Sequence, residues 1–410
     1  MAHSSDSYNL LSAEAFANPY PIYGRMRSET PVYWYERFEA WVLTRYDDVK
    51  TMLDHLEMLV VSPVSFPEDV PTEQQAKQQK IAEFLGRWVI YQNPPRQTVL
   101  RQLLSQGFKA ITIRDLRPRI QAIADELLDE LTANGEEMDV IWDFSFPFAV
   151  TVIAEILGVP SSDRYLFKAW ALKLRDANIG YIDDPELIDE IDQIIDAAKS
   201  YLSVLVAERR QNLGGDLTSG LVRVQEDGRM LEDEELLSNL LLLLFGGQET
   251  TMHMIGNGLL ALLKHPDQCQ MLKENPGLIE IAVEEFLRYE SPGPLAMRIT
   301  GTDLTLGGQV MCAGQKVFGM VGAANRDPAH FPEPDRLDIT RQPNRHLAFG
   351  HGVHFCLGAA LARLEGQIVF PTLLRRLPQL RLGTEDLDWC RSIAIRGTTT
   401  LPVVFKLKGY

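Results

Sequence analysis

The residues with the most distinctive chemistry in this sequence lie between Phe349 and Gly358, in the stretch FGHGVHFCLG. The stretch holds one thiol, Cys356, with Gly350 and Gly352 just before it and Gly358 just after. Helical spacing follows at once, so a helix should begin after the thiol and stabilise a thiolate through its dipole and first amides. Glycines let the backbone approach a flat group closely. The pattern predicts a thiolate ligand to iron in a planar macrocycle; the alternative is a buried thiol beside a turn.

An acid and an alcohol stand side by side in the stretch GGQETT, as Glu249 and Thr250. An alcohol beside a carboxylate can relay protons to a reacting group in a site that excludes bulk water. The alternative is a threonine bonded back to its own helix beside a solvated glutamate. We predict that Glu249 and Thr250 are catalytic.

The elements that must position these residues are mainly helical. Helical spacing predicts helices over residues 20–29 and 113–134, and a long central helix from Asp233 to about His265. The poor helix formers in GGQETT predict a break at its midpoint. Short strand patterns lie at 31–36, 40–46, 305–323 and 398–407. The fold class is mainly α with small β-sheets, and without a linker the 410 residues should form one domain.

Composition excludes several classes of protein. Lys and Arg number 40 against 56 Asp and Glu, a net charge of −16, which disfavours nucleic-acid binding. The longest apolar run, at 240–245, is too short to span a membrane. The first twenty residues show neither the charged start nor the apolar stretch expected of a signal peptide, and the cysteines at 269, 312, 356 and 390 lack zinc or disulfide spacing. We expect a cytoplasmic protein that binds neither membrane nor nucleic acid.

The motif at 349–358 resembles the haem-thiolate signature of the cytochrome P450 family, in the residues Phe349, Gly350, Gly352, His354, Cys356 and Gly358. Three further stretches stand in the family's order: FGGQETT, EEFLR and FPEPDRLDI. The opening NPYPIYGRMRSETPVYW is similar to that of soluble bacterial members, so the resemblance covers the whole chain. It implies a P450-like single large domain over residues 1–410, with a long central helix and haem b ligated by Cys356.

The resemblance also implies roles for other residues. EEFLR supplies Glu285 and Arg288, one helical turn apart, which with Arg336 resemble a buried structural network. A pair alone at that spacing is equally compatible with a surface ion pair. The residues implied at the haem propionates are Arg101, Arg298, His346, His354 of the signature, and Gln97, the last where the family often has His. The residues implied at the apolar substrate are Leu242, Phe245, Gly246 (where Ala is usual), Pro294, Leu295, Ala296 and Ile395.

The implied function is a monooxygenase that inserts one oxygen atom of O2 into an apolar or amphipathic small molecule. Such members commonly tailor natural products, as polyketide hydroxylases or epoxidases. A peroxide-dependent enzyme is the first alternative, although such enzymes typically lack the acid–alcohol pair. A non-catalytic haem protein that binds ligands or senses gas is the second. A cysteine hydrolase is disfavoured because Cys356 and His354 are only two residues apart in a glycine loop.

Electrons must come from a separate protein, because no flavin or iron–sulfur module is evident in the chain. We expect a monomer served by ferredoxin and ferredoxin reductase from NAD(P)H. Residues 87–119 carry seven bases and one acid, a net of +6 against −16 for the whole chain. By resemblance this segment lies on the sulfur side of the haem, where an acidic ferredoxin would dock. The alternative is a solvated basic helix.

Overall fold

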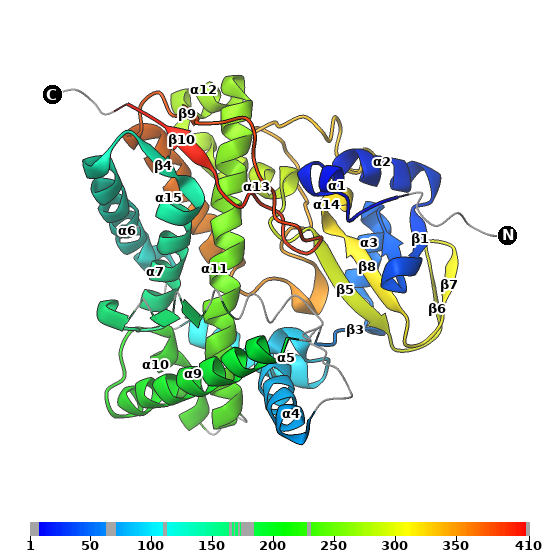
Figure 1. The fold of residues 1–410 in the computed structure, drawn as a ribbon, viewed down its shortest axis with the longest axis vertical. Helices are drawn as coiled ribbons and strands as arrows, with labels where there is room; N and C mark the ends of the chain where they lie inside the picture. The colour runs from blue at the N-terminus through cyan, green and yellow to red at the C-terminus, as the bar shows by residue number, and fades with distance from the viewer. Residues whose placement is uncertain are drawn as a thin grey trace. The chain divides into compact units, whose positions relative to one another are not determined.

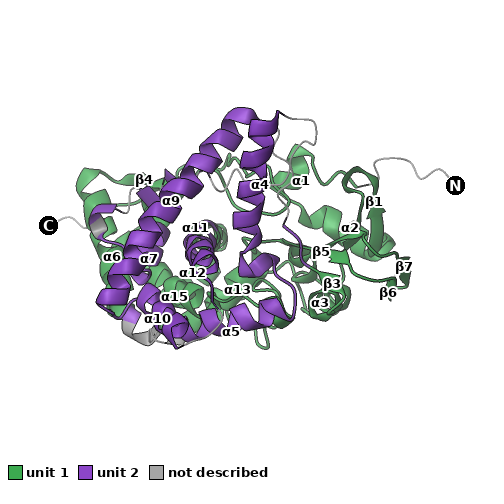
Figure 2. Ribbon diagram, turned by 90° about the horizontal axis from the view of Figure 1, so that it is seen from below, with its two compact units in different colours: residues 1–59, 117–148, 250–410 green, residues 60–116, 149–249 purple. Residues whose placement is uncertain are grey.

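The computed structural model describes residues 8–62, 71–109, 113–163, 166–167, 169–170, 173, 184–227 and 231–406. The chain falls into two compact units, coloured separately in Figure 2. Unit 1 comprises residues 1–59, 117–148 and 250–410, and unit 2 comprises residues 60–116 and 149–249. The helices α6 (Ile113–Asn134), α7 (Phe146–Ile156) and α11 (Asp233–Lys264) continue from one unit into the other.

Unit 1 contains every strand of the described chain. Its other helices are α1 (Ala13–Ala17), α2 (Tyr20–Glu29), α3 (Tyr46–Asp54), α12 (Pro266–Glu274), α13 (Ile279–Tyr289), α14 (Val321–Ala324) and α15 (Ala359–Arg376). Its strands are β1 (Val32–Tyr35), β2 (Ala40–Leu43), β3 (Met58–Leu59), β4 (Glu137–Asp139), β5 (Leu295–Thr300), β6 (Leu304–Leu306), β7 (Gln309–Met311), β8 (Lys316–Met320), β9 (Arg381–Leu382) and β10 (Pro402–Val404).

The largest sheet has the order β1-β2-β8-β5-β3, and Figure 1 shows it beside α2 and α3. The strands β2 and β8 are parallel, with Ala40 opposite Lys316, and the other pairs are antiparallel. This order joins strands that lie about 270 residues apart in sequence, so the sheet is a product of tertiary packing. The smaller sheets are β4-β10-β9 and the hairpin β6-β7.

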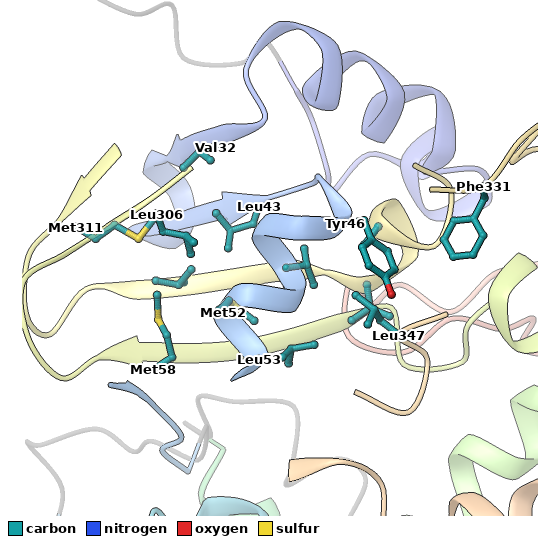
Figure 3. Packing of buried hydrophobic residues seen from close by; sticks show 14 residues of the cluster. Val32, Leu43, Tyr46, Met52, Leu53, Met58, Leu306, Met311, Phe331 and Leu347 are labelled. Atoms are coloured by element: carbon teal, nitrogen blue, oxygen red, sulfur yellow. The ribbon is translucent and has the colours of Figure 1, made fainter. Parts of the chain in front are cut away.

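Packing of α3 on the large sheet forms a hydrophobic core in unit 1 (Figure 3). Leu43 of the sheet and Met52 of α3 are fully buried in it. Leu347, which is 2% exposed, belongs to the same cluster and stands two residues before Phe349, the start of the FGHGVHFCLG stretch. The core therefore anchors the start of the cysteine loop.

A second packing centre of unit 1 joins α13, α15 and the C-terminal half of α11. Phe286 of α13 and Phe370 of α15 meet edge to face, with ring centroids 4.8 Å apart. A Cβ on Gly258 of α11 would lie 2.4 Å from Phe370 Cζ, so this close approach requires a glycine. This contact fixes the helix that carries Thr250 against the helix that follows Cys356.

Unit 2 is helical in its described part: α4 (Thr72–Gly86), α5 (Arg96–Lys109), α9 (Pro185–Gln211), α10 (Leu217–Glu226) and the N-terminal half of α11. Lys80 of α4 pairs with Asp192 and Asp196 of α9, at 2.8 and 2.7 Å. Asn239 of α11 accepts from the amide of Val89 at 2.9 Å. Ion pairs and one buried amide thus join the helices of this unit.

The predicted elements at 20–29 and 113–134 match α2 and α6, and the central helix matches α11. The predicted break in α11 is wrong, because the helix runs through GGQETT without interruption. Residues on both sides of this stretch are buried, and that packing outweighs the low helix propensity of two glycines and two threonines. None of the helices in the described ranges combines the length and apolar character needed to cross a bilayer.

Candidate active site

Cys356 stands in a loop whose backbone folds back on itself. Its amide donates to the carbonyl of Phe349 at 2.9 Å. Gly350 and Gly352 have φ angles of 71° and 68°, which residues other than glycine rarely adopt. The thiol residue is exposed, and α15 begins directly after Gly358. The loop therefore presents one sulfur at the N-terminus of a helix of 18 residues.

The C-terminal end of α3 supports this loop. A Cβ on Gly352 would lie 2.8 Å from the carbonyl oxygen of Leu53 and 3.0 Å from Asp54 Oδ1. Asp54 Oδ2 also contacts Lys50 Nζ at 2.8 Å and His351 Nε2 at 3.3 Å. Glycine at 352 is thus required by the available space as well as by its φ angle.

A cation and a carboxylate that the sequence analysis did not single out lie beside the loop. Arg363 of α15 donates two hydrogen bonds to Glu284 of α13, at 2.7 and 2.9 Å, and its guanidinium lies 4.5 Å from the ring centroid of Phe349. His346 Nε2 lies 3.1 Å from the same carboxylate. Burial would raise the pKa of Glu284, but hydrogen bonds from His346 and Arg363 lower it to about 2. Glu284 is therefore ionised at neutral pH and holds both partners.

Arg298 of β5 is a buried cation that suits an anionic ligand. It is 8% exposed, and its Nη1 donates to the carbonyl of Met297 at 2.8 Å. No carboxylate of the described chain lies within ion-pair distance, and burial lowers its pKa to about 10. A buried charge without a counter-ion is unfavourable. The side chain thus fits a haem propionate, the role predicted for it.

Of the other two predicted propionate ligands of unit 1, His346 precedes the cysteine motif and His354 lies within it. His346 Nδ1 accepts from the amide of Ala348 at 3.2 Å while Nε2 faces Glu284. A propionate would therefore compete with Glu284 for the Nε2 proton. His354 is half-buried and ends the 3₁₀ turn Gly352–His354 that leads to Cys356. Their contacts with a propionate stay predictions.

The predicted catalytic pair lies near the middle of α11. Thr250 is exposed and Glu249 is half-buried. Because successive helical residues point about 100° apart, the two side chains face different directions. The exposed Gly246 lies one helical turn before Thr250, and nothing lies within 4 Å of where its Cβ would be. This part of α11 therefore leaves room beside the threonine.

The next threonine carries a second acid–alcohol pair, which sequence reasoning missed. Thr251 Oγ1 donates to Glu365 Oε2 of α15 at 3.1 Å, and both residues are buried. Burial raises the pKa of Glu365 to about 8, an effect that the bond from Thr251 only partly offsets. Glu365 thus holds a proton at neutral pH. The available signal was an acid four positions from both Leu361 and Val369, on an apolar face of α15.

The structural network forms, although one of its predicted members is wrong. Arg288 donates to Glu285 at 2.7 and 2.8 Å, and both side chains are fully buried. Arg341 completes the network, with Nε 3.2 Å from each oxygen of Glu285. The side chain of Arg336, the predicted member, is 60% exposed and pairs with Glu333 at 3.3 Å.

The backbone of Arg336 explains this correction. Its carbonyl accepts from Arg288 and Arg341, each at 3.2 Å, so the loop turns its backbone inward and its side chain outward. Sequence reasoning chose Arg336 because it follows the Pro-rich turn in FPEPDRLDI. The second arginine of the same loop, Arg341, was the available alternative.

Two segments of unit 1 carry predicted substrate residues. Pro294 is buried, and residues 295 and 296 are half-buried at the start of β5. Ile395 is half-buried in the loop before β10. The amide of Arg396 donates to the carbonyl of Pro292 at 2.8 Å, so the structure brings these two segments together.

The remaining predicted residues lie in unit 2. Gln97 and Arg101 are one turn apart on α5; the first is 1% exposed and the second half-buried. Leu242 is buried, and the ring of Phe245 stacks on Trp88, with centroids 5.6 Å apart. Trp88 was not singled out from the sequence. That these residues converge with the cysteine loop stays a prediction.

All four cysteines lie within the described ranges and are thiols. Cys269 is buried inside α12, and burial raises its pKa. Cys312 is exposed after β7, and Cys390 is half-buried with its Sγ 4.0 Å from His253 Nε2. Only Cys356 of the four precedes a helix N-terminus in a glycine loop.

Known proteins resemble the chain over nearly its whole length. A family model described as Cytochrome P450 matches residues 181–379. The polyketide biosynthesis cytochrome P450 PksS of Bacillus subtilis is 38% identical over 398 residues, covering 94% of this chain and 95% of that one. Cytochrome P450 monooxygenase PikC of Streptomyces venezuelae is 38% identical over 401 residues, covering 96% and 92%. The crystal structure of P450BioI in complex with acyl carrier protein ligated to hexadec-9Z-enoic acid matches with a TM-score of 0.86 at 37% identity, covering 96% and 99%.

A mainly helical fold with small sheets, and a thiol at the start of a long helix, define the haem-thiolate class of proteins. With this identity over almost the full length, the chain belongs to the cytochrome P450 family. Its cofactor is haem held through a cysteine thiolate, and its activity is that of a monooxygenase. The predicted family, fold class, cofactor and enzyme class are confirmed.

Proposed function

We propose that residues 1–410 form one haem-thiolate monooxygenase domain in which Cys356 is the axial ligand. The observation that carries this assignment is the exposed thiol at the end of a glycine loop, directly before α15. The helix N-terminus favours the thiolate form of the sulfur. Phe349, Gly350 and Gly358 shape the loop around it.

Propionate binding would fall to cations and donors that precede the motif or lie within it. Arg298 has the strongest support, because it is buried without a carboxylate partner in the described chain. His346 and His354 would donate from unit 1, and Gln97 and Arg101 from α5. Gln97 can donate a hydrogen bond but brings no charge.

Bound haem supplies the iron chemistry that activates dioxygen. The protein's own part is to move protons to that site. The hydroxyl of Thr250 would donate a hydrogen bond on the substrate side of α11, and the carboxylate of Glu249 would pass protons from solvent. Glu365 of α15, which is buried and holds a proton next to Thr251 of α11, is a further proton donor beside this stretch of α11.

The ligand assignment is tested by the carbon monoxide complex of the reduced protein. We expect wild type to show the red-shifted Soret band of thiolate ligation, and Cys356→Ser to lose it. Cys269→Ser, Cys312→Ser and Cys390→Ser should keep it. A thiolate band in Cys356→Ser, or its loss in Cys390→Ser with haem retained, would overturn the assignment.

The proton relay is tested by the yield of product per NAD(P)H. Thr250→Ala should leave haem and substrate binding intact but divert electrons to peroxide or water. Glu249→Gln should lower kcat more than it alters KM, because the carboxylate acts after substrate binds. An unchanged yield in Thr250→Ala would disprove the role of this hydroxyl.

The substrate that the chain's features favour is an apolar or amphipathic natural product. The residues predicted at the substrate are aliphatic or aromatic apart from Gly246. The names of PksS and PikC and the acyl chain bound by P450BioI support a polyketide-like or acyl-chain substrate for hydroxylation or epoxidation. Spectral titration with polyketide and acyl-chain metabolites of the host tests this class, and binding confined to unrelated polar compounds would exclude it.

Electrons would reach this cytoplasmic monomer from NAD(P)H through ferredoxin reductase and ferredoxin. Val353 and Phe355, beside Cys356, are 40% and 38% exposed. Arg117 of α6 is exposed and donates to Gln367 of α15 at 3.0 Å. Exposed apolar side chains beside the cysteine and an exposed arginine held against α15 would suit an acidic ferredoxin.

The structure narrows the choice of charge reversals in the basic segment 87–119. Arg96 is ion-paired with Glu235 of α11 and is therefore a poor test position. The side chains of Lys109 and Arg114 lie outside the described residues. Arg117→Glu should slow the first electron transfer and reduce its salt dependence, because screening acts over about 8 Å at physiological salt. Arg25→Glu on α2 serves as the control. Equal rates of first electron transfer in both variants would show that the ferredoxin docks elsewhere.

A further inference from the structure

Asn257 of α11 joins two segments of unit 1 through one side chain. Its Nδ2 donates to the carbonyl of Glu290 at 3.2 Å and to the carbonyl of Arg396 at 2.9 Å. The residue is 2% exposed. The side-chain amide of Asn257 has two N–H donors, and the two carbonyls engage both of them. A shift of either segment would leave a buried donor without its acceptor.

Each of these segments is next to predicted substrate residues. Glu290 ends α13 and is followed by the turn that carries Pro294 into β5. Arg396 directly follows Ile395. The segments are also joined to each other, because Arg396 Nε donates to Glu290 Oε1 at 2.6 Å and the Arg396 amide donates to the carbonyl of Pro292 at 2.8 Å. Glu290, Arg396 and Asn257 form what we call the α11 clamp.

The clamp and the predicted oxygen site share one face of α11. Thr250, His253 and Asn257 lie at positions i, i+3 and i+7, which line up along a helix. A Cβ on Gly397 would lie 2.0 Å from His253 Nδ1, so the C-terminal loop presses directly on this face. A change in the clamp would therefore move Ile395 relative to Thr250.

We propose that Asn257 is a positioning residue for substrate selection: it fixes the segments 292–296 and 392–396 at a set distance from Thr250. The inference rests on the proposed function, which places these segments at the substrate. Asn257 itself is buried behind them and does not touch the substrate. Its role differs from a purely structural one, because loosening the clamp should change which ligands fit rather than only the stability.

The test compares Asn257→Ala with Gln268→Ala in the holoprotein. Gln268 is a matched control, because it is 4% exposed and accepts from the amide of Ile339 at 3.1 Å, away from these segments. The first measurement is amide hydrogen exchange, which should speed up at residues 390–397 and 291–296 only in Asn257→Ala. The second is the Kd of imidazole and of 4-phenylimidazole, whose ring nitrogen ligates haem iron directly. The ratio of the two constants should shift at least about fivefold in Asn257→Ala, since a bulky group senses the wall.

Each outcome decides the question. Faster exchange with an unchanged ratio of the two Kd values would show that Asn257 has a structural role only. Unchanged exchange would show that Asn257 does not hold the two segments. If Asn257→Ala does not fold, Arg396→Lys loosens the same clamp from the other segment and should shift the ratio in the same direction. Failure of wild type to give the thiolate carbon monoxide band would instead refute the proposed function.

Discussion

The two sides of α15 carry opposite electrostatic arrangements. Arg363 and Glu365 are two positions apart and so point about 200° apart around the helix. On one side, Arg363 meets the ionised Glu284 beside the cysteine loop. On the other side, Glu365 accepts a hydrogen bond from the hydroxyl of Thr251, near the middle of α11. Within the described chain this hydroxyl is its only side-chain hydrogen-bond partner.

The contrast shows that partners, rather than burial alone, set the charge of a carboxyl group. Burial acts to raise the pKa in both cases, yet hydrogen bonds from His346 and Arg363 lower that of Glu284 to about 2 while that of Glu365 rises to about 8. The side of α15 facing the thiol therefore keeps fixed charges. The side facing α11 keeps a proton, which suits the chemistry proposed for each side.

Removing a cation from a compensated carboxylate should have the largest effect. Arg341→Ala leaves the fully buried Glu285 with one arginine fewer, and we expect a loss of about 3–5 kcal/mol in unfolding free energy, with weakened haem retention. Arg336→Ala, whose side chain is 60% exposed, should cost less than about 0.5 kcal/mol. Urea unfolding of the holoprotein measures both. Equal losses in the two variants would contradict the network with Arg341.

Glu365→Gln tests the contrast between the two carboxyl groups through the pH dependence of stability. The folded-state pKa of Glu365, about 8, lies above its ordinary value of 4.5. Its contribution to stability is therefore complete below about pH 4.5 and is lost as pH rises toward 8, at up to about 1.4 kcal/mol per pH unit. Glu365→Gln removes this loss, so its stability relative to wild type should increase from pH 6 to about pH 8. Glu130→Gln, at an exposed position of α6, should run parallel to wild type in the same unfolding series.

Glu284→Gln should show the opposite pH dependence and a smaller effect. The pKa of Glu284 is lowered from 4.5 to about 2, so its contribution is present above about pH 4.5 and is lost as pH falls toward 2. At neutral pH we expect a loss of about 1 kcal/mol, because the pair with Arg363 is partly exposed. Thermal unfolding at a series of pH values measures the difference in stability from wild type, which should shrink on acidification below pH 4.5. A difference that grows on acidification would show that the predicted direction of the pH dependence is wrong.

Sequence alone determined the local features of this protein. Helical periodicity located α2, α6 and α11, because an amphipathic pattern is read within a single element. The glycines around Cys356 predicted a tight loop before a helix, and two of them, Gly350 and Gly352, have positive φ angles. The spacing of Glu285 and Arg288 predicted their pairing, since residues three apart share a helix face.

Tertiary structure alone decided the contacts between distant segments. Whether Arg336 or Arg341 faces Glu285 depends on how a loop turns, and no periodicity encodes that direction. Thr251 with Glu365, Arg363 with Glu284, and Asn257 with Arg396 each join residues from about 80 to about 140 positions apart. The helix α11 stays unbroken through GGQETT because its flanking turns are packed, although its local propensity favours a break. Burial and partner choice, which exist only in the folded chain, thus fixed the charges at this site.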